Sequence, residues 1–160
     1  IGFLEPLPSN SMDPKKVSLV ADLHRWRTFE DSLVTCYFVP FNFEKLIEVV
    51  KAVTGWNTTV YEGMKVGERA IQLARIFNIR EGIGSQYDRL PGRFNEPVPR
   101  GGIKGAYISP EELEQALSYY YQEMGWTANG VPGRYVLEKL DIGWAYGFLD
   151  PTAYKEGHPG

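Results

Sequence analysis

The chain has 160 residues, 43% of them hydrophobic and 23% charged, which is ordinary for a single globular domain with its own core. Its net charge of −3, with no long basic run, argues against nucleic acid as a partner. No apolar stretch approaches the ~20 residues that a membrane span needs, so we expect no membrane. One cysteine cannot form an internal disulfide, so nothing indicates secretion and the cytoplasm is the expected compartment. The start at Ile1 suggests a fragment or a processed product.

The first predicted elements are an irregular lead-in over residues 1–12 and a helix that follows it. Asp13 and Pro14 indicate the helix start, because Asp caps helices well and proline is tolerated at the first helical position. Apolar residues at helical spacing predict that this helix continues to about Cys36. Its predicted inward positions are Val17, Val20, Leu23 and Trp26.

A second helix is predicted between Asn42, a good cap, and Gly55, which suits the left-handed position after a helix. Its inward positions would be Leu46, Ile47, Val50 and Val53.

A third helix is predicted from Thr59, which forms a capping-box pattern with Glu62, to about Gly82. Its expected inward stripe is Val66, Ala70, Leu73 and Phe77. Gly63 and Gly67 lie four residues apart inside it, which would let another backbone approach closely.

Residues 83–107 show no periodicity and hold several prolines and glycines. A segment this long inside a compact domain is usually functional or packed on a partner. The sequence therefore predicts one long irregular loop in the middle of the chain.

A fourth helix begins with Ser109 and Pro110, which combine a capping box and a first-position proline, and ends at Gly125. Its stripe would be Leu113, Leu117, Tyr120 and Met124. A short fifth helix is expected from Pro132, and residues 144–160 would form a tail. The predicted fold class is mainly α: a multi-helix orthogonal bundle with one long irregular loop, over residues 13–143.

The residues by themselves support little chemistry. Cys36 follows the carboxylate Asp31 by five residues, but a lone cysteine most often behaves as a small buried hydrophobe. His24 is too distant from Cys36 in the sequence for a local ligand motif, and one cysteine with two histidines cannot make a metal site of the usual kind. Arginines such as Arg75 could bind an anion or could be solvated or paired with carboxylates.

Four motifs add a resemblance. DSLVTCYF, VGERAIQLARIFNIREG, DRLPGRF and SPEELEQALSYYYQEMGWTANGVPGRYVLEKLDI occur in this order between about Asp13 and Ile142. Together they resemble the C-terminal region of the aldehyde ferredoxin oxidoreductase family, tungsten-pterin enzymes that also include the catalytic subunit of class II benzoyl-CoA reductases.

The resemblance implies roles for the first motif. Asp31 would contact a pterin of a tungsten (or molybdenum) bis-pterin, and Cys36 would be one ligand of a [4Fe–4S] cluster, as thiolates are in such clusters. Val34 and Thr35 would lie against the pterin. The family often has Gly-Leu directly before this cysteine, and Val34-Thr35 departs from that pattern. The other cluster cysteines and the catalytic residues, which stay unknown, would lie upstream.

The resemblance therefore implies a domain of a larger enzyme that oxidises aldehydes to carboxylic acids with ferredoxin as electron acceptor. Its partners would be the upstream domains of that enzyme and ferredoxin, and whether the isolated chain is an enzyme at all is uncertain. The isolated chain would be inactive and free of cofactors. The alternative is a protein that is not an enzyme domain: a free-standing helical interaction module that keeps the fold without the cofactors.

Overall fold

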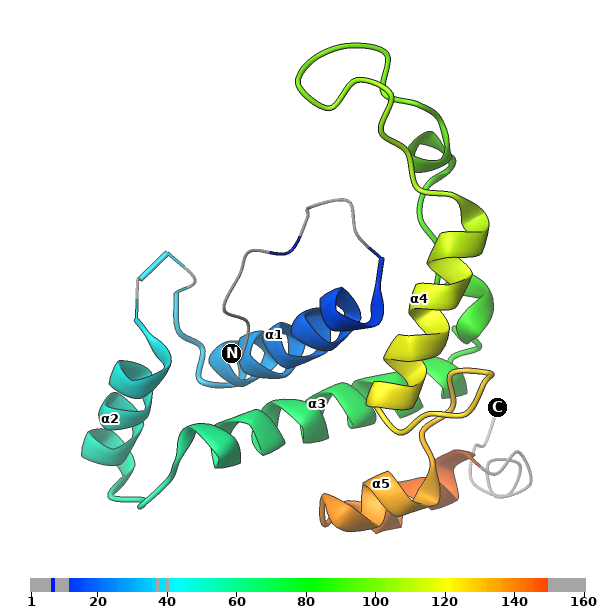
Figure 1. Ribbon diagram of the computed structural model, residues 1–160. Helices are drawn as coiled ribbons and strands as arrows, with labels where there is room; N and C mark the ends of the chain where they lie inside the picture. The colour runs from blue at the N-terminus through cyan, green and yellow to red at the C-terminus, as the bar shows by residue number, and fades with distance from the viewer. Residues whose placement is uncertain (1–6, 8–11, 37, 40, 150–160) are drawn as a thin grey trace.

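The computed structural model describes residues 7, 12–36, 38–39 and 41–149, and these residues are mainly helical (Figure 1). Their helices are α1 (Pro14–Ser32), α2 (Phe43–Thr54), α3 (Val60–Arg80), α4 (Pro110–Glu123) and α5 (Arg134–Lys139). Short 3-10 helices span Ser85–Tyr87, Gly92–Asn95 and Gly143–Leu149. The described part contains no strand beyond one isolated bridge between Trp126 and Pro132. The predicted mainly α class is confirmed.

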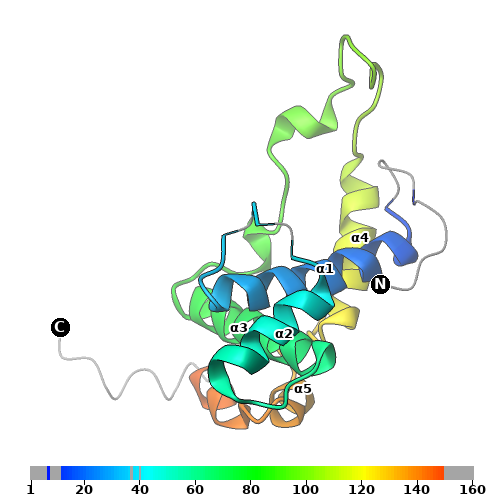
Figure 2. The same ribbon diagram turned by 90° about the vertical axis from the view of Figure 1, so that its left-hand side faces the viewer.

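Helix α3 is the axis of the molecule. Figure 1 shows α1 lying along it in the opposite direction, α2 at one end and α4 rising steeply at the other. Helix α5 lies on the other side of α3 from α1 (Figures 1 and 2). None of the described helices combines the length and the apolar character that crossing a bilayer requires.

Three hydrophobic clusters hold the helices against one another. Trp26 and Phe29 of α1 pack with Leu46, Ile47 and Val50 of α2. Ala21 of α1, Ile71 of α3 and Met124 after α4 form a second, smaller cluster. The third joins α3 to α5 and the 3-10 helix that follows, through Ile76, Val136, Leu137, Leu140, Ile142 and Ala145. Burial of these side chains is the main term that stabilises the arrangement.

Four of the five predicted helix starts are confirmed, whereas α5 begins at Arg134, after Gly133 as its cap, rather than at Pro132. The Asp13 carboxylate accepts from Lys16 N–H at 3.0 Å, and the Asn42 side chain accepts from Lys45 N–H at 2.7 Å. Ser109 forms the complete capping box. In α3 the Thr59 hydroxyl accepts from Glu62 N–H and donates to the Glu62 carboxylate. Local sequence alone fixes these starts, because a cap needs only residues one turn apart.

The predicted end of α1 and several inward positions were wrong. Helix α1 ends at Ser32 rather than near Cys36. Exposed side chains include Val20, Leu23, Val53, Val66 and Phe77, all predicted to point inward. On α3 the buried face consists of glycines, polar residues and two isoleucines: Gly63, Gly67, Glu68, Ile71, Gln72, Arg75 and Ile76. Apolar spacing cannot reveal such a face, because most of its members are not apolar.

The close approach that Gly63 and Gly67 predict is confirmed. A Cβ atom on Gly67 would lie 1.8 Å from the Arg25 carbonyl oxygen, and one on Gly63 would lie 2.9 Å from the Phe29 ring. The backbones of α1 and α3 therefore meet at a separation that only glycine permits.

The predicted irregular segment begins after α3 and ends in a long arm, residues 91–108. The arm stands clear of the helices (Figures 1 and 2). Its own backbone bonds hold it, from Val98 N–H to Ala106 O at 3.0 Å and from Ile108 N–H to Phe94 O at 2.9 Å. Exposed apolar side chains on it are Phe94, Ile103 and Tyr107. Residues 144–149 of the predicted tail pack on α5 through Ala145, and residues 150–160 and most of the lead-in lie outside the described part.

Candidate functional site

The end of α1 and the turn after it carry all four residues to which the resemblance assigns a cofactor role: Asp31, Val34, Thr35 and Cys36. Val34 N–H bonds to Asp31 O at 3.0 Å and Thr35 N–H to Glu30 O at 3.4 Å, which is the Schellman pattern at a helix C-terminus. This pattern needs a left-handed residue, and Val34 supplies it with φ 56°. A β-branched residue is unusual there, because its Cβ crowds the backbone.

Asp31 and Cys36 are both exposed on this turn. Asp31 lies in the last turn of α1 rather than in the loop after it. The exposed thiol excludes the interpretation of Cys36 as a buried small hydrophobe. The Val34 side chain is 91% exposed, whereas the Thr35 hydroxyl donates to Glu30 O at 3.1 Å.

A pocket of about 640 Å³, the central pocket, lies beside α1. Its floor and walls come from α1, α3, α4 and residues 87–90. Apolar side chains dominate the lining, among them Val20, Ala70, Ile71, Ala74, Leu113 and Leu117. The polar groups around it include His24, Arg75, Asp88, Arg89 and Tyr120.

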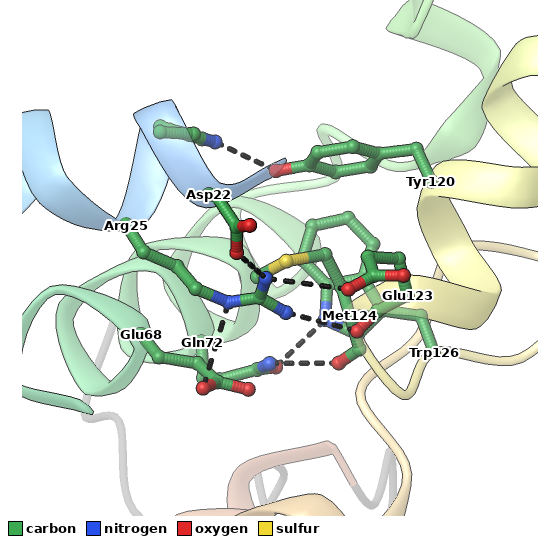
Figure 3. A network of polar contacts seen from close by, with 9 residues as sticks. Asp22, Arg25, Glu68, Gln72, Tyr120, Glu123, Met124 and Trp126 are labelled. Carbon is green, nitrogen blue, oxygen red and sulfur yellow. Dashed lines mark hydrogen bonds and ion pairs between the residues drawn. The ribbon is translucent and has the colours of Figure 1, made fainter. Parts of the chain in front are cut away.

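An ion cluster around Arg25 fastens α1 to α3 and α4 (Figure 3). The Arg25 guanidinium lies 3.1 Å from Asp22, 3.6 Å from Glu68 and 3.5 Å from Glu123, and it donates to Glu123 O at 3.0 Å. The Arg25 side chain is 10% exposed and that of Glu68 is 11% exposed. A buried charge needs such partners, so removing one of them would leave the others uncompensated.

Gln72 makes a second link between α3 and the end of α4 (Figure 3). Its amide donates to Met124 O at 2.9 Å and its oxygen accepts from Trp126 Nε1 at 2.7 Å. Gln72 is fully buried, and an unpaired amide there would destabilise the core. Because its nitrogen and its oxygen are both hydrogen-bonded, that cost is avoided.

Arg75 anchors the irregular segment to the helices. It donates twice to the Asp88 carboxylate, at 2.9 and 2.6 Å, and once to Gly130 O at 2.8 Å. The Tyr121 hydroxyl also donates to Asp88. Burial alone would raise the pKa of Asp88, but the bonds from Arg75 and Tyr121 outweigh it and hold that pKa below its ordinary value. Of the two interpretations left open for Arg75, pairing with a carboxylate is the one the structure shows.

His24 and Tyr120 form a pair that no sequence signal could have revealed, because they lie 96 residues apart. His24 Nδ1 and the Tyr120 hydroxyl are 2.6 Å apart, across α1 and α4. Burial, and secondarily the charge of Arg25, lower the pKa of His24, and burial raises the pKa of Tyr120 to about 12. Both groups are therefore neutral near pH 7.

Within the described residues, no three His, Cys, Asp or Glu side chains gather closely enough to hold a metal ion. An iron–sulfur cluster at Cys36 would thus need thiolates from other segments. The donor types nevertheless fit one side of such a site. An exposed thiol can ligate iron, and an exposed carboxylate can accept bonds from pterin N–H groups.

Comparison with known proteins gives related sequences in several archaea. The model of the family described as aldehyde ferredoxin oxidoreductase, domains 2 and 3, matches residues 2–142. The WOR-like subunit of an aliphatic sulfonate oxidoreductase from Pyrococcus furiosus is 38% identical over 73% of this chain and 20% of its own length. A tungsten-containing aldehyde ferredoxin oxidoreductase from the same organism is 29% identical over 91% of this chain and 24% of its own.

A solved structure shares the fold. The active-site complex of benzoyl coenzyme A reductase with 1,5-dienoyl-CoA superimposes with a TM-score of 0.69 at 21% identity, over 96% of this chain and 24% of the other. The chain thus spans about a fifth to a quarter of the length of the proteins it matches. Because the model of domains 2 and 3 matches most of its residues, the chain belongs to the aldehyde ferredoxin oxidoreductase family.

Proposed function

We propose that this chain is the part of a tungsten-pterin oxidoreductase that closes one side of the cofactor site, in an enzyme that oxidises aldehydes to carboxylic acids. The observation that carries the proposal is the exposed turn Asp31–Cys36, which lies inside the span matched by the family model. Molybdenum in place of tungsten would use the same protein groups.

In this proposal Cys36 ligates one iron of a [4Fe–4S] cluster and Asp31 accepts hydrogen bonds from the pterin. The N–H groups of Val34 and Thr35 are already bonded within the helix cap, so their contact with a pterin would come through carbonyl oxygens. When bound, the metal-pterin would supply the two-electron oxidation and the cluster a path for single electrons to ferredoxin. The Schellman turn fixes the backbone path from Asp31 to Thr35, and the Asp31 carboxylate and the Cys36 thiol are both exposed beside it.

One thiolate cannot hold such a cluster, so we expect the chain alone to be inactive and free of metal. The remaining ligands would come from upstream domains. The arm 91–108 supports such a partner surface, because it stands clear of the helices and exposes Phe94, Ile103 and Tyr107 (Figures 1 and 2).

The test uses the full enzyme that contains this chain. We expect Cys36→Ser to lose cluster iron and the electron paramagnetic resonance signal of the reduced cluster. Asp31→Ala should lower the metal-pterin content instead. Ser32→Ala, an exposed neighbour, is the matched control and should change neither.

Unchanged iron content in Cys36→Ser would remove the proposal. It would favour the alternative, a helical interaction module without cofactors, for which the exposed apolar side chains of the arm are the supporting observation.

A further inference from the structure

The central pocket runs along α1 toward the turn Asp31–Cys36. Its wall on α1 is made by Val20, His24 and Thr28, which repeat every four residues on one face. Asp31 follows Thr28 by three residues and continues the same face, about 5 Å further along the axis. The pocket therefore lies beside the end of α1, where Asp31 is the residue that we assign to the cofactor.

The His24–Tyr120 pair places one hydrogen-bond donor at this wall. The neutral imidazole has one N–H and the phenol has one O–H, and a single hydrogen bond joins the two groups at 2.6 Å. If the hydroxyl donates to Nδ1, the imidazole keeps its Nε2–H. If Nδ1–H donates, the hydroxyl proton stays available. In either tautomer one of the two protons is left for a third group.

The rest of the lining disfavours a charged ligand. Arg75 is committed to Asp88 by two hydrogen bonds, so its charge is already balanced. Arg89 also lines the pocket but is exposed, and an ion pair in water contributes little. Burying a carboxylate against Val20, Ala70 and Leu117 would cost its hydration.

We infer that the central pocket binds a small uncharged apolar molecule that carries one carbonyl oxygen, with the His24–Tyr120 pair donating to that oxygen. The identification of this molecule with the aldehyde substrate rests on the proposed function. A volume of about 640 Å³ lies within the range of small-molecule sites and leaves room for an aromatic ring or a branched aliphatic chain.

The probe is benzamide, an uncharged carbonyl compound that does not react with lysine, titrated into the 160-residue chain and followed by nuclear magnetic resonance. We expect amide shifts concentrated at Val20, Thr28, Ala70 and Ala74. Benzoate should bind more weakly. Tyr120→Phe keeps the ring but frees His24 from its partner, and His24→Phe removes the imidazole. The double variant should weaken benzamide binding about three- to tenfold, as expected for one lost hydrogen bond.

Two further variants make the outcome decisive. Ala74→Phe places a ring in the pocket from an exposed position and should abolish binding, whereas Asp31→Ala should leave it intact. No shifts with benzamide, or equal binding by the chain and by Ala74→Phe, would overturn the inference. So would equal affinity for benzamide in the chain and in the double variant. Loss of cluster iron in Cys36→Ser together with absent benzamide binding would mean that this inference fails while the proposed function stands.

Discussion

Val34 and Asp141 are the two described residues other than glycine that have positive φ, and both end a helix in the Schellman pattern. Asparagine and aspartate tolerate this conformation, whereas a β-branched residue does not. We therefore expect Val34→Gly to raise the free energy of unfolding by about 0.5–1 kcal/mol, part of the gain being offset by the freer unfolded chain. Urea unfolding of the chain and of Val34→Gly measures this difference in the free energy of unfolding. Asp141→Gly is the control and should change stability little; a loss of stability in Val34→Gly would contradict the argument.

Cys36 is the second residue whose environment makes a direct prediction. Its thiol is exposed in the described structure, so a bulky disulfide reagent should label one thiol per native chain promptly. Reaction only after addition of denaturant would show that the thiol is covered in solution. It would also weaken the assignment of Cys36 as a ligand that faces other domains.

At the scale of helices, the crossing of α1 over α3 depends on Gly67. Because a Cβ there would lie 1.8 Å from the Arg25 carbonyl oxygen, Gly67→Ala must push the two helices apart. We expect a loss of about 3 kcal/mol or more, at the upper end of overpacking effects. Gly102→Ala, in open space on the arm, is the matched control and should stay within about 0.5 kcal/mol. Equal stability of the two variants by thermal unfolding would refute the close crossing.

The arm and α3 should differ in their local stability. The arm stands clear of the helices, whereas α3 is covered by α1, α4 and α5 (Figures 1 and 2). Hydrogen exchange at residues 91–108 should therefore be much faster than around Leu73. Comparable protection in the two segments would mean that the arm is stabilised by contacts within the isolated chain.

For the whole molecule, two adjacent tyrosines predict a sensitivity to alkali. Burial raises the pKa of Tyr120 and, together with its bond to Asp88, that of Tyr121, each to about 12 from an ordinary value of 10.0. The folded chain then holds these protons more tightly than the unfolded chain. The contribution of the two tyrosines to the free energy of unfolding is therefore fully present below pH 10 and is lost as the pH rises toward 12.

Chemical unfolding measured across this range checks the prediction. Tyr121→Phe should flatten the loss of stability between pH 10 and 12, because it removes one of the two groups that titrate late. Tyr119→Phe, on an exposed hydroxyl of the same helix, is the control and should leave the slope unchanged. A pH dependence identical in the chain and in Tyr121→Phe would contradict the assignment.

The sequence by itself determined the mainly α class, the helix starts at Asp13, Asn42, Thr59 and Ser109, and the close approach at Gly67. These features depend on residues one turn apart or on a single missing side chain, so local chemistry is sufficient. The turn with Asp31 and Cys36 was found through a family resemblance, and the structure shows that both residues are exposed.

Only the tertiary structure decided which faces are buried and what they bring together. Arg25, Gln72 and Arg75 lie inward because partners on distant segments compensate them, and no periodicity of apolar residues can show that. The sequence also could not reveal the His24–Tyr120 pair and the pocket beside it, because the chain between the two residues must fold before they meet.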